Sequence, residues 1–200
     1  MRTNWAASFI LAVTLHVVRR ALGVVLVGTS LALAGVVIGP GPARAVDVGE
    51  SAPEFTLPST TGADISLRDF QGKKFVLLEF YGGDFHPTLT ANLLARKASL
   101  KSFEDLGVQN LAISANSTFS QQTFAESLKL QFPLLSDYPE RRVIRSYAVL
   151  NEKSMAARRS FFLIDPQGII RKKWIIENGS TTTVYSPTLL KDIRDIVDKR

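Results

Sequence analysis

The sequence contains no cysteine in its 200 residues. That absence excludes disulfide bonds, thiolate zinc sites, iron–sulfur clusters and every reaction that uses a thiol nucleophile. Histidine is nearly as scarce, since only His16 and His86 are present and no HExxH or HxH spacing occurs. The sequence therefore predicts neither a metal site nor a bound cofactor.

Acidic residues are missing from the first 45 positions, which hold four of the 24 basic residues. The other 155 residues carry 20 basic against 18 acidic side chains, a net charge of +2 compared with +6 for the whole chain. The basic character belongs mainly to the N-terminal segment, and later runs such as Arg171-Lys172-Lys173 are interpreted as solvated charges. A nucleic-acid partner is not expected.

Residues 1–45 have the pattern of an export signal. Arg19-Arg20 precedes an uncharged run from Ala21 to Gly39, and Ala43-Arg44-Ala45 supplies a small-x-small cleavage motif. Cleavage there would leave Val46 as the first residue of the mature protein. The paired arginines are compatible with a twin-arginine signal or with a general secretory one.

This leader leaves two outcomes open. If it is cleaved, the protein is exported to a periplasm, a thylakoid lumen or the extracellular space, and this outcome is favoured. The uncharged run of 19 residues is also long enough to anchor the chain in a membrane if it stays uncleaved. We therefore predict an export signal, or an uncleaved anchor, over residues 1–45 and one domain over residues 46–200.

The domain begins with strand patterns. A turn at Thr61-Gly62 separates Phe55–Leu57 from Asp64–Ser66 and predicts an opening hairpin. The nearly continuous apolar run from Lys74 to Phe80 is typical of a strand that is buried on both faces. Val108–Ser114 has the same character and predicts a second central strand.

Helix patterns alternate with these strands. Apolar spacing predicts one amphipathic helix over Thr90–Leu106 and another that Asn116 or Ser117 can cap. The remaining expected elements are an extended segment, a helical segment, two strands joined by an Asp-Pro-Gln-Gly turn, and a closing helix: Phe132–Leu135, Glu140–Tyr147, Ser160–Ile164, Ile169–Ile176 and Pro187–Val197. This alternation predicts an α/β protein with a thioredoxin-like fold, a central mixed sheet flanked by helices.

Three long segments carry a family resemblance. They read VGESAPEFTLPSTTGADISLRDFQGKKFVLLEF near the start of the domain, AISANSTFSQQTFAESLKLQFPLLSDYPERRVIRSYAVL in its middle and RRSFFLIDPQGIIRKKW toward its end. Together they resemble the alkyl hydroperoxide reductase/thiol-specific antioxidant superfamily of peroxiredoxins, closest to the peroxiredoxin Q (bacterioferritin comigratory protein) branch. For an intact member, the resemblance implies a thioredoxin-like fold and thioredoxin-dependent reduction of peroxides.

The segment that would carry this activity departs from the family pattern. The family motif is Pro-x-x-x-Thr-x-x-Cys, and in the matching stretch GGDFHPTL Gly82 stands for the proline, His86 for the threonine and Leu89 for the peroxidatic cysteine. The resolving cysteine of this branch, five residues on, is replaced by Leu94. Of the family's active-site arginines, Arg159 remains. We expect both leucines on the face of one helix, with Leu89 filling the former pocket.

No other residue readily replaces the missing nucleophile. Thr88 and Thr90 flank the cysteine position, but a hydroxyl nucleophile needs an adjacent base, and His86 is the only candidate. The favoured interpretation is that one threonine caps the helix and that His86 is a loop residue. Arg159 is interpreted either as a retained anion-binding group or as the structural partner of Asp84 or Glu79.

Three functions follow from this pattern. The leading one is a peroxiredoxin-like pseudoenzyme that has lost thiol peroxidase activity and binds a protein partner or a small molecule at the degenerate cleft. The alternative is an antioxidant oxidoreductase, a thioredoxin-dependent peroxide reductase, as the resemblance implies; whether the protein is an enzyme stays open at this point. The third is a membrane-tethered structural protein, which requires an uncleaved leader.

Overall fold

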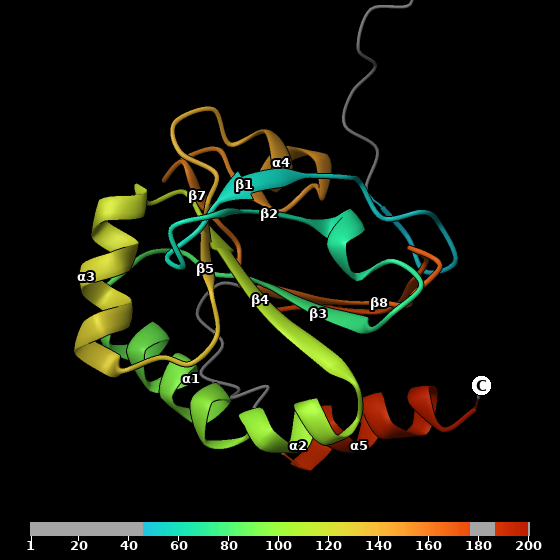
Figure 1. Cartoon of the computed structure of the whole chain (residues 1–200). Helices are drawn as coiled ribbons and strands as arrows, with labels where there is room; N and C mark the ends of the chain where they lie inside the picture. Colours follow the sequence, from blue (N-terminus) through green and yellow to red (C-terminus); the bar gives the residue numbers. More distant parts are fainter. Residues whose placement is uncertain (1–45, 177–186, 200) are drawn as a thin grey trace, which may run out of the picture. The chain divides into compact units, whose positions relative to one another are not determined.

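The computed structural model describes residues 46–176 and 187–199 (Figure 1). The predicted export signal over residues 1–45 lies outside the described residues. Among the residues described, no helix combines the length and the apolar character that crossing a membrane requires.

A five-stranded sheet forms the centre of the fold, with strand order β5-β4-β3-β8-β9. Strands β3, β4 and β5 run parallel to one another, whereas β8 and β9 are antiparallel to their neighbours, so the sheet is mixed as predicted. The bounds are β3 Phe75–Phe80, β4 Val108–Ser114, β5 Leu134–Ser136, β8 Ser160–Ile164 and β9 Ile170–Ile175. All six residues of β3 are buried, which confirms the expectation drawn from its apolar run.

Two small hairpins accompany the sheet. Strand β1 (Thr56–Pro58) pairs with β2 (Asp64–Ser66) in antiparallel register, with Leu57 opposite Ile65, and this confirms the predicted opening hairpin. Gly62 in its turn has φ +85°, a conformation that side chains rarely adopt. The second hairpin joins β6 (Leu150–Asn151) to β7 (Ala156–Ala157) and lies directly before β8.

The helices are divided between the two faces of the sheet. Their bounds are η1 Leu67–Phe70, α1 Pro87–Ala98, α2 Leu100–Asp105, α3 Thr118–Leu128, α4 Arg142–Ser146 and α5 Pro187–Val197. In Figure 1, α1, α2 and α5 lie below the sheet, whereas α4 and the β1–β2 hairpin lie above it. The chain thus forms layers on both sides of one sheet, as a thioredoxin-like fold requires.

Alternation along β3 explains how one strand serves both layers. Val76, Leu78 and Phe80 point into the cluster beneath α4 and the β1–β2 hairpin. Phe75 and Leu77 point to the opposite face, where Phe103 of α2 and Ile193 of α5 cover them. A continuous apolar run was therefore the correct signal for a strand with no solvent-facing side.

The single helix predicted over 90–106 is two helices. Ser99 ends α1 and precedes α2 with φ −98° and ψ 0°, and its N–H still donates to carbonyls of the last turn of α1. Serine is a poor residue for a helix interior because its hydroxyl competes for backbone hydrogen bonds. Leu100 and Phe103 of α2 are both buried, so the break preserves the packing that the apolar spacing indicated.

Candidate functional site

The loop after β3 carries the segment that departs from the family motif, and it leads directly into α1. Helix α1 begins at Pro87, and His86 occupies the N-cap position without a side-chain hydrogen bond to the helix. The prediction that Thr88 or Thr90 caps this helix is wrong. Proline at the first helical position sets the start instead, because its fixed φ suits that position and its missing N–H is not needed there.

The structure brings Gly82 and Leu89 together. A Cβ atom placed on Gly82 would lie 3.6 Å from Cδ1 of Leu89 and 3.5 Å from the carbonyl oxygen of Ala157. Both distances are ordinary van der Waals contacts, so the site has room for a side chain at position 82. The loop after β3, the first turn of α1 and the end of β7 therefore meet at the place where the sequence resemblance puts the degenerate cleft, and we keep the name cleft for this place.

Arg159 lies beside this cleft. Phe80, the last residue of β3, pairs with Ser160, the first residue of the antiparallel strand β8. Tyr81, which follows Phe80, and Arg159, which precedes Ser160, therefore leave the sheet at the same end of this pair. The Arg159 side chain is half-buried, and its carbonyl accepts a hydrogen bond of 3.0 Å from the N–H of Ile176. Arg158 is also half-buried and donates from Nη2 to the carbonyl of Ala148 at 2.5 Å.

Leu89 and Leu94 have different surroundings. Leu89 is half-buried and packs against the cluster that contains Tyr81, Leu93 and Phe124. Leu94 is 42% exposed. The expectation that both leucines share one helix face is wrong, because five residues at about 100° each separate two side chains by about 140°.

Asp84 connects the site loop to α3. Its Oδ1 accepts a hydrogen bond of 2.9 Å from the Tyr81 hydroxyl, and its Oδ2 accepts one of 2.5 Å from Ser120 Oγ. Burial raises the pKa of Asp84 above its usual value, and the two hydroxyl donors oppose that shift. Burial, together with the Asp84 charge, holds the pKa of Tyr81 well above its usual value.

Two aromatic side chains are exposed around this loop. Phe85 has φ +61° and is 55% exposed, and its ring lies 4.9 Å from that of Phe124 at a tilt of 52°. Phe119, near the start of α3, is 85% exposed. His86 is exposed as well. The site loop and the start of α3 therefore present apolar and imidazole groups to solvent.

A polar network next to Asp84 was not predicted from the sequence. Gln121 donates to Ser114 Oγ at 2.9 Å and to the carbonyl of Leu135 at 2.8 Å, and Ser136 donates to the carbonyl of Asn116 at 2.7 Å. The order and direction of the predicted strands could have indicated this network. The carboxyl ends of neighbouring parallel strands meet at one edge of a sheet, and Ser114 and Ser136 end two of those strands.

A buried ion pair beneath α1 was also not predicted. Nη2 of Arg96 lies 3.3 Å from Oε2 of Glu79, and both side chains are almost completely buried. Arg96 also donates from Nη1 to Asn110 at 3.0 Å. The available signal was Glu79 itself, the single charge within the apolar strand β3, since such a charge requires a buried partner. Glu79 thus pairs with Arg96, and Asp84 accepts hydrogen bonds from Tyr81 and Ser120.

The chain is similar to known peroxiredoxins. The family model described as the AhpC/TSA family matches residues 48–173. A peroxiredoxin of Thermoplasma volcanium is 35% identical over 137 residues, which are 66% of this chain and 65% of that protein, so the match spans just under two thirds of that relative. The putative peroxiredoxin bcp of Coxiella burnetii is 36% identical over 135 residues, 64% of this chain and 88% of the relative.

Solved structures agree with the fold. The reduced 2-Cys peroxiredoxin of Plasmodium vivax superposes with a TM-score of 0.70 at 25% identity, covering 77% of this chain and 98% of that chain. The peroxidoxin BcpB of Mycobacterium tuberculosis superposes with a TM-score of 0.67 at 25% identity, covering 76% and 98%.

Proposed function

The chain belongs to the AhpC/TSA family of peroxiredoxins, and we propose that it is a member that has lost thiol peroxidase activity and uses its cleft to bind a partner. The observation that carries the proposal is the identity of residue 89. Leu89 occupies the position of the peroxidatic cysteine in the family motif, and the chain contains no cysteine at any other position.

Peroxide reduction by this family requires a thiolate. The sulfur attacks one oxygen of the O–O bond, the bond breaks, and the leaving oxygen takes a proton to become water or an alcohol while the thiolate becomes a sulfenic acid. A leucine side chain has no lone pair to donate and no proton to lose. Thr88 and Thr90 flank Leu89 in the sequence, and neither makes a side-chain hydrogen bond to His86 among the described residues.

The surroundings of Leu89 support a role in binding. Gly82 leaves space beside Leu89 and the Ala157 carbonyl, and the half-buried Arg159 lies next to the start of the site loop. The N-terminus of α1 contributes partial positive charge at the same place. A place that combines an apolar side chain, a helix N-terminus and a neighbouring arginine suits a protein segment or a small molecule that has both apolar and anionic parts.

The compartment is part of the proposal. We propose that the protein acts after export, in a periplasm, a thylakoid lumen or outside the cell, because residues 1–45 have the composition of an export signal. Contact with a membrane is proposed only for a form that keeps this segment. Sequencing the N-terminus of the protein isolated from its source tests the assignment, and a native chain that begins before Val46 contradicts cleavage at the predicted site.

A peroxidase assay tests the loss of activity. The 200-residue protein is mixed with hydrogen peroxide or an organic hydroperoxide, with thioredoxin or dithiothreitol as reductant, and peroxide consumption is followed. We expect a rate equal to that of a blank without protein. A rate well above the blank, retained after removal of contaminating enzymes, would overturn the proposal in favour of a thioredoxin-dependent antioxidant oxidoreductase, the activity that family membership alone implies.

Restoring the sulfur tests whether the cleft is preserved. The double variant Leu89→Cys with His86→Thr returns two residues of the family motif, and Leu94→Cys is a matched control because its side chain is exposed on another side of the same helix. We expect the double variant to reduce peroxide faster than Leu94→Cys does. Equal rates would show that the cleft no longer supports the reaction even with a thiol present.

Site-specific photo-crosslinking tests the binding role. A photoreactive residue at exposed position 86 samples the outer side of the cleft, and one at exposed position 94 samples a different part of α1. We expect the same crosslinked species to form repeatedly at position 86 and not at position 94. Equal labelling at both positions contradicts a binding role for the cleft.

A further inference from the structure

Helix α1 carries the cleft at its start, yet most of its buried side chains are polar. Three of its 12 residues are buried: Asn92, Leu93 and Arg96. Leu93 is the apolar member of this set, and the half-buried Leu89 joins it in the cluster beneath the helix. Apolar contacts have no preferred direction, so this small apolar face does not by itself define how α1 is rotated on the sheet.

Arg96 supplies contacts that do have a direction. Its Nη2 lies 3.3 Å from Oε2 of Glu79 on β3, and its Nη1 donates to Oδ1 of Asn110 on β4 at 3.0 Å. The rings of Phe103 and Phe161 lie against the same guanidinium. A guanidinium is planar and presents its donors in fixed directions, so these neighbours select one orientation of the Arg96 side chain.

The two polar partners belong to one face of the sheet. Leu77 of β3 is the register partner of Asn110 in the parallel strand β4. Glu79 lies two residues beyond Leu77 and therefore projects from the same face. Glu79 and Asn110 thus form a fixed receptor for Arg96 on two neighbouring central strands.

This contact also determines where the first turn of α1 points. Seven residues at about 100° each fall about 20° short of two full turns, so Leu89 and Arg96 lie on one face of the helix. Leu94 lies on another face and is 42% exposed. The rotation of α1 that brings Arg96 to Glu79 is therefore the rotation that turns position 89 inward and position 94 outward.

We propose that Arg96 is a positioning residue, whose contacts with Glu79 and Asn110 set the rotation of α1 and so keep position 89 turned toward the cleft. Fixing the register of packed elements is the best-attested use of a buried polar group. The position of α1 matters for binding only if the cleft holds a partner, as proposed above. The measurements below need no partner, so either proposal can fail without the other.

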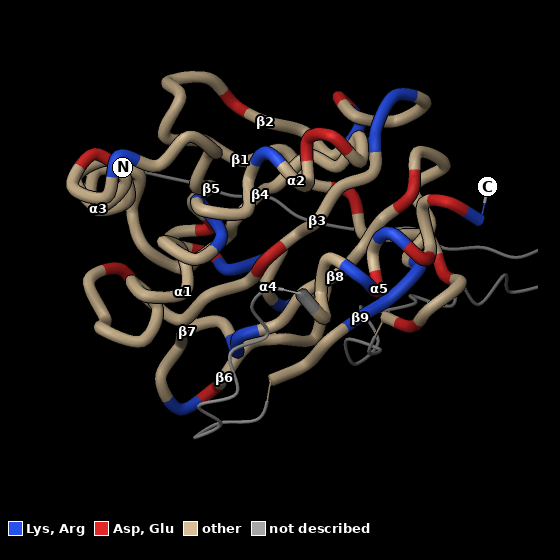
Figure 2. Tube along the Cα trace, turned by 90° about the horizontal axis from the view of Figure 1, so that it is seen from below, with Lys and Arg blue, Asp and Glu red and all other residues tan. Residues whose placement is uncertain are grey.

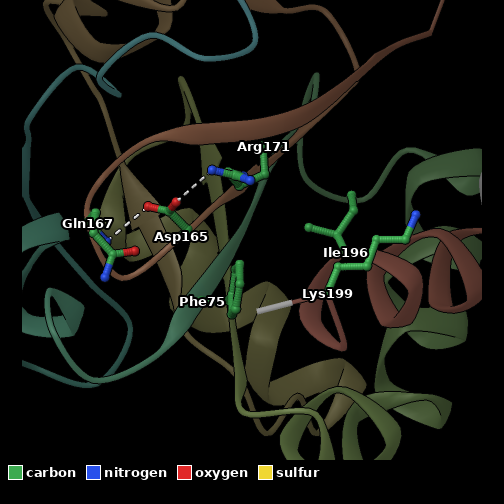
Figure 3. A pocket seen from close by; sticks show the side chains of 6 residues that line it. All are labelled: Phe75, Asp165, Gln167, Arg171, Ile196 and Lys199. Atoms are coloured by element: carbon green, nitrogen blue, oxygen red, sulfur yellow. Dashed lines mark hydrogen bonds and ion pairs between the residues drawn. The ribbon is translucent and has the colours of Figure 1, made fainter.

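Ion pairs on β9 differ because their cations remain partly in solvent. Figure 2 shows basic residues along β9, and Lys172 and Lys173 lie 2.6 Å and 2.9 Å from aspartate oxygens, so their interpretation as solvated charges is wrong. Arg171 lines a cavity of about 320 Å³ and lies 3.4 Å from Asp165, but its side chain is 52% exposed (Figure 3). Water competes for such cations, whereas Arg96 is 1% exposed and holds its partners more firmly.

Lys97 provides a matched control on the same helix turn. Its Nζ donates to the carbonyl of Leu128 at 2.9 Å, and its side chain is half-buried. An ammonium group on a flexible stem can follow a small rotation of the helix, unlike the planar guanidinium of Arg96. Lys97→Met therefore removes a neighbouring cation and its hydrogen bond without touching the contact that is proposed to set the rotation.

Amide hydrogen exchange tests the positioning role. The 200-residue protein is compared with the double variant Glu79→Leu with Arg96→Met and with Lys97→Met, and exchange in α1 is expressed relative to exchange in β3 and β4, which corrects for global stability. We expect α1 of the double variant to exchange about tenfold faster or more on this relative scale, and Lys97→Met to leave the ratio unchanged. An unchanged ratio in the double variant would overturn the proposal, because the apolar contacts would then suffice.

Thiol labelling tests the consequence at position 89. Leu89→Cys and Leu94→Cys are each combined with Arg96→Lys, which keeps the charge and loses the planar guanidinium, and labelling with a disulfide reagent is timed. We expect Arg96→Lys to raise the labelling rate at position 89 several-fold and to leave the rate at position 94 unchanged. Equal changes at both positions, or no change at position 89, would overturn the proposal.

Discussion

Arg96 is a fully buried cation in the core of this protein. Its guanidinium lies 3.3 Å from Glu79 and 3.0 Å from Asn110, and its central carbon is 5.1 Å from the ring centroids of both Phe103 and Phe161. These neighbours belong to three strands and to α2. A charge in this environment is tolerated because the paired carboxylate, the amide and the two aromatic faces together replace water.

Breaking this pair on one side should be costly. We expect Arg96→Met to lower the free energy of unfolding by about 3–5 kcal/mol, because it removes the buried guanidinium that faces the Glu79 carboxylate. Adding Glu79→Leu should recover much of that loss, since both charges are then absent. Urea unfolding followed by circular dichroism measures the difference.

An exposed ion pair provides the control for this experiment. Arg145 and Glu152 lie 2.8 Å apart, and both side chains are largely in solvent. Glu152→Gln should change the free energy of unfolding by less than about 1 kcal/mol. A double variant at positions 79 and 96 that is no more stable than Arg96→Met would contradict the interpretation of the buried pair as mutually compensating.

Asp84 gives the stability a defined pH dependence. Burial raises its pKa in the folded protein above the ordinary value of 3.8, so the folded state holds this proton more tightly than the unfolded chain does. Above its folded pKa, the ionised Asp84 carboxylate lowers the free energy of unfolding, because burial disfavours the charge. This loss of stability disappears as the pH falls to 3.8, where the carboxyl group also takes up its proton in the unfolded chain. Relative to Asp84→Asn, the wild-type protein should gain stability between pH 7 and about pH 4.

Urea unfolding of both proteins at the two pH values measures this difference. Titration of the other carboxyl groups is common to both proteins and cancels in the comparison. A wild-type protein that loses stability relative to Asp84→Asn on acidification would instead mean that the hydrogen bonds from Tyr81 and Ser120 outweigh burial.

At the level of elements, the two helices that meet at the site loop begin differently. Helix α1 starts at a proline and has no side-chain cap, whereas Ser117 caps α3 by accepting a hydrogen bond of 3.3 Å from the N–H of Ser120. Ser120 in turn donates to Asp84. The start of α3 is therefore part of the structure that holds the site loop in place.

Removing the cap of α3 should have a moderate effect. We expect Ser117→Ala to lower the free energy of unfolding by about 1 kcal/mol, because one N–H at the helix start loses its acceptor. Thr123→Ala within the same helix is the control, and it should be neutral or slightly stabilising because alanine is the better helix former. Thermal unfolding of both variants compares them, and equal losses would argue against a capping role.

Helix boundaries illustrate what local sequence signals resolve. The closing helix was predicted over Pro187–Val197 and has those bounds, because a proline opens it and its apolar spacing is strong. The predicted helix over 90–106 is instead divided at Ser99. Apolar periodicity indicates which residues face the core. A helix break that keeps those residues facing the core leaves the periodicity unchanged, so the sequence pattern does not predict the break.

At the scale of the whole molecule, one sheet serves both apolar layers. The side chains of β3 alternate between the cluster under α4 and the cluster under α2 and α5. Both clusters depend on the same strand, so disrupting β3 removes packing from both faces of the sheet at once. The described fold should accordingly unfold as one cooperative unit.

Coincident transitions would demonstrate this cooperativity. Trp174 lies on β9 in the layer with α5, and its indole N–H donates to Asp192 at 3.4 Å, so its fluorescence reports on that layer. In a Trp5→Phe variant, denaturant unfolding followed by this fluorescence should coincide with unfolding followed by far-ultraviolet circular dichroism. A fluorescence transition at lower denaturant concentration would mean that α5 detaches first.

The amino-acid sequence alone determined the family, the order of strands and helices, and the absence of a thiol at position 89. These properties depend on residue identity and on local periodicity, which are written directly in the chain. Tertiary structure decided the rest: that Leu89 is half-buried against a core cluster while Leu94 is exposed, that Glu79 meets Arg96, and that Arg171 lines a cavity. Each of these depends on segments distant in sequence, and only packing around the shared sheet brings such segments together.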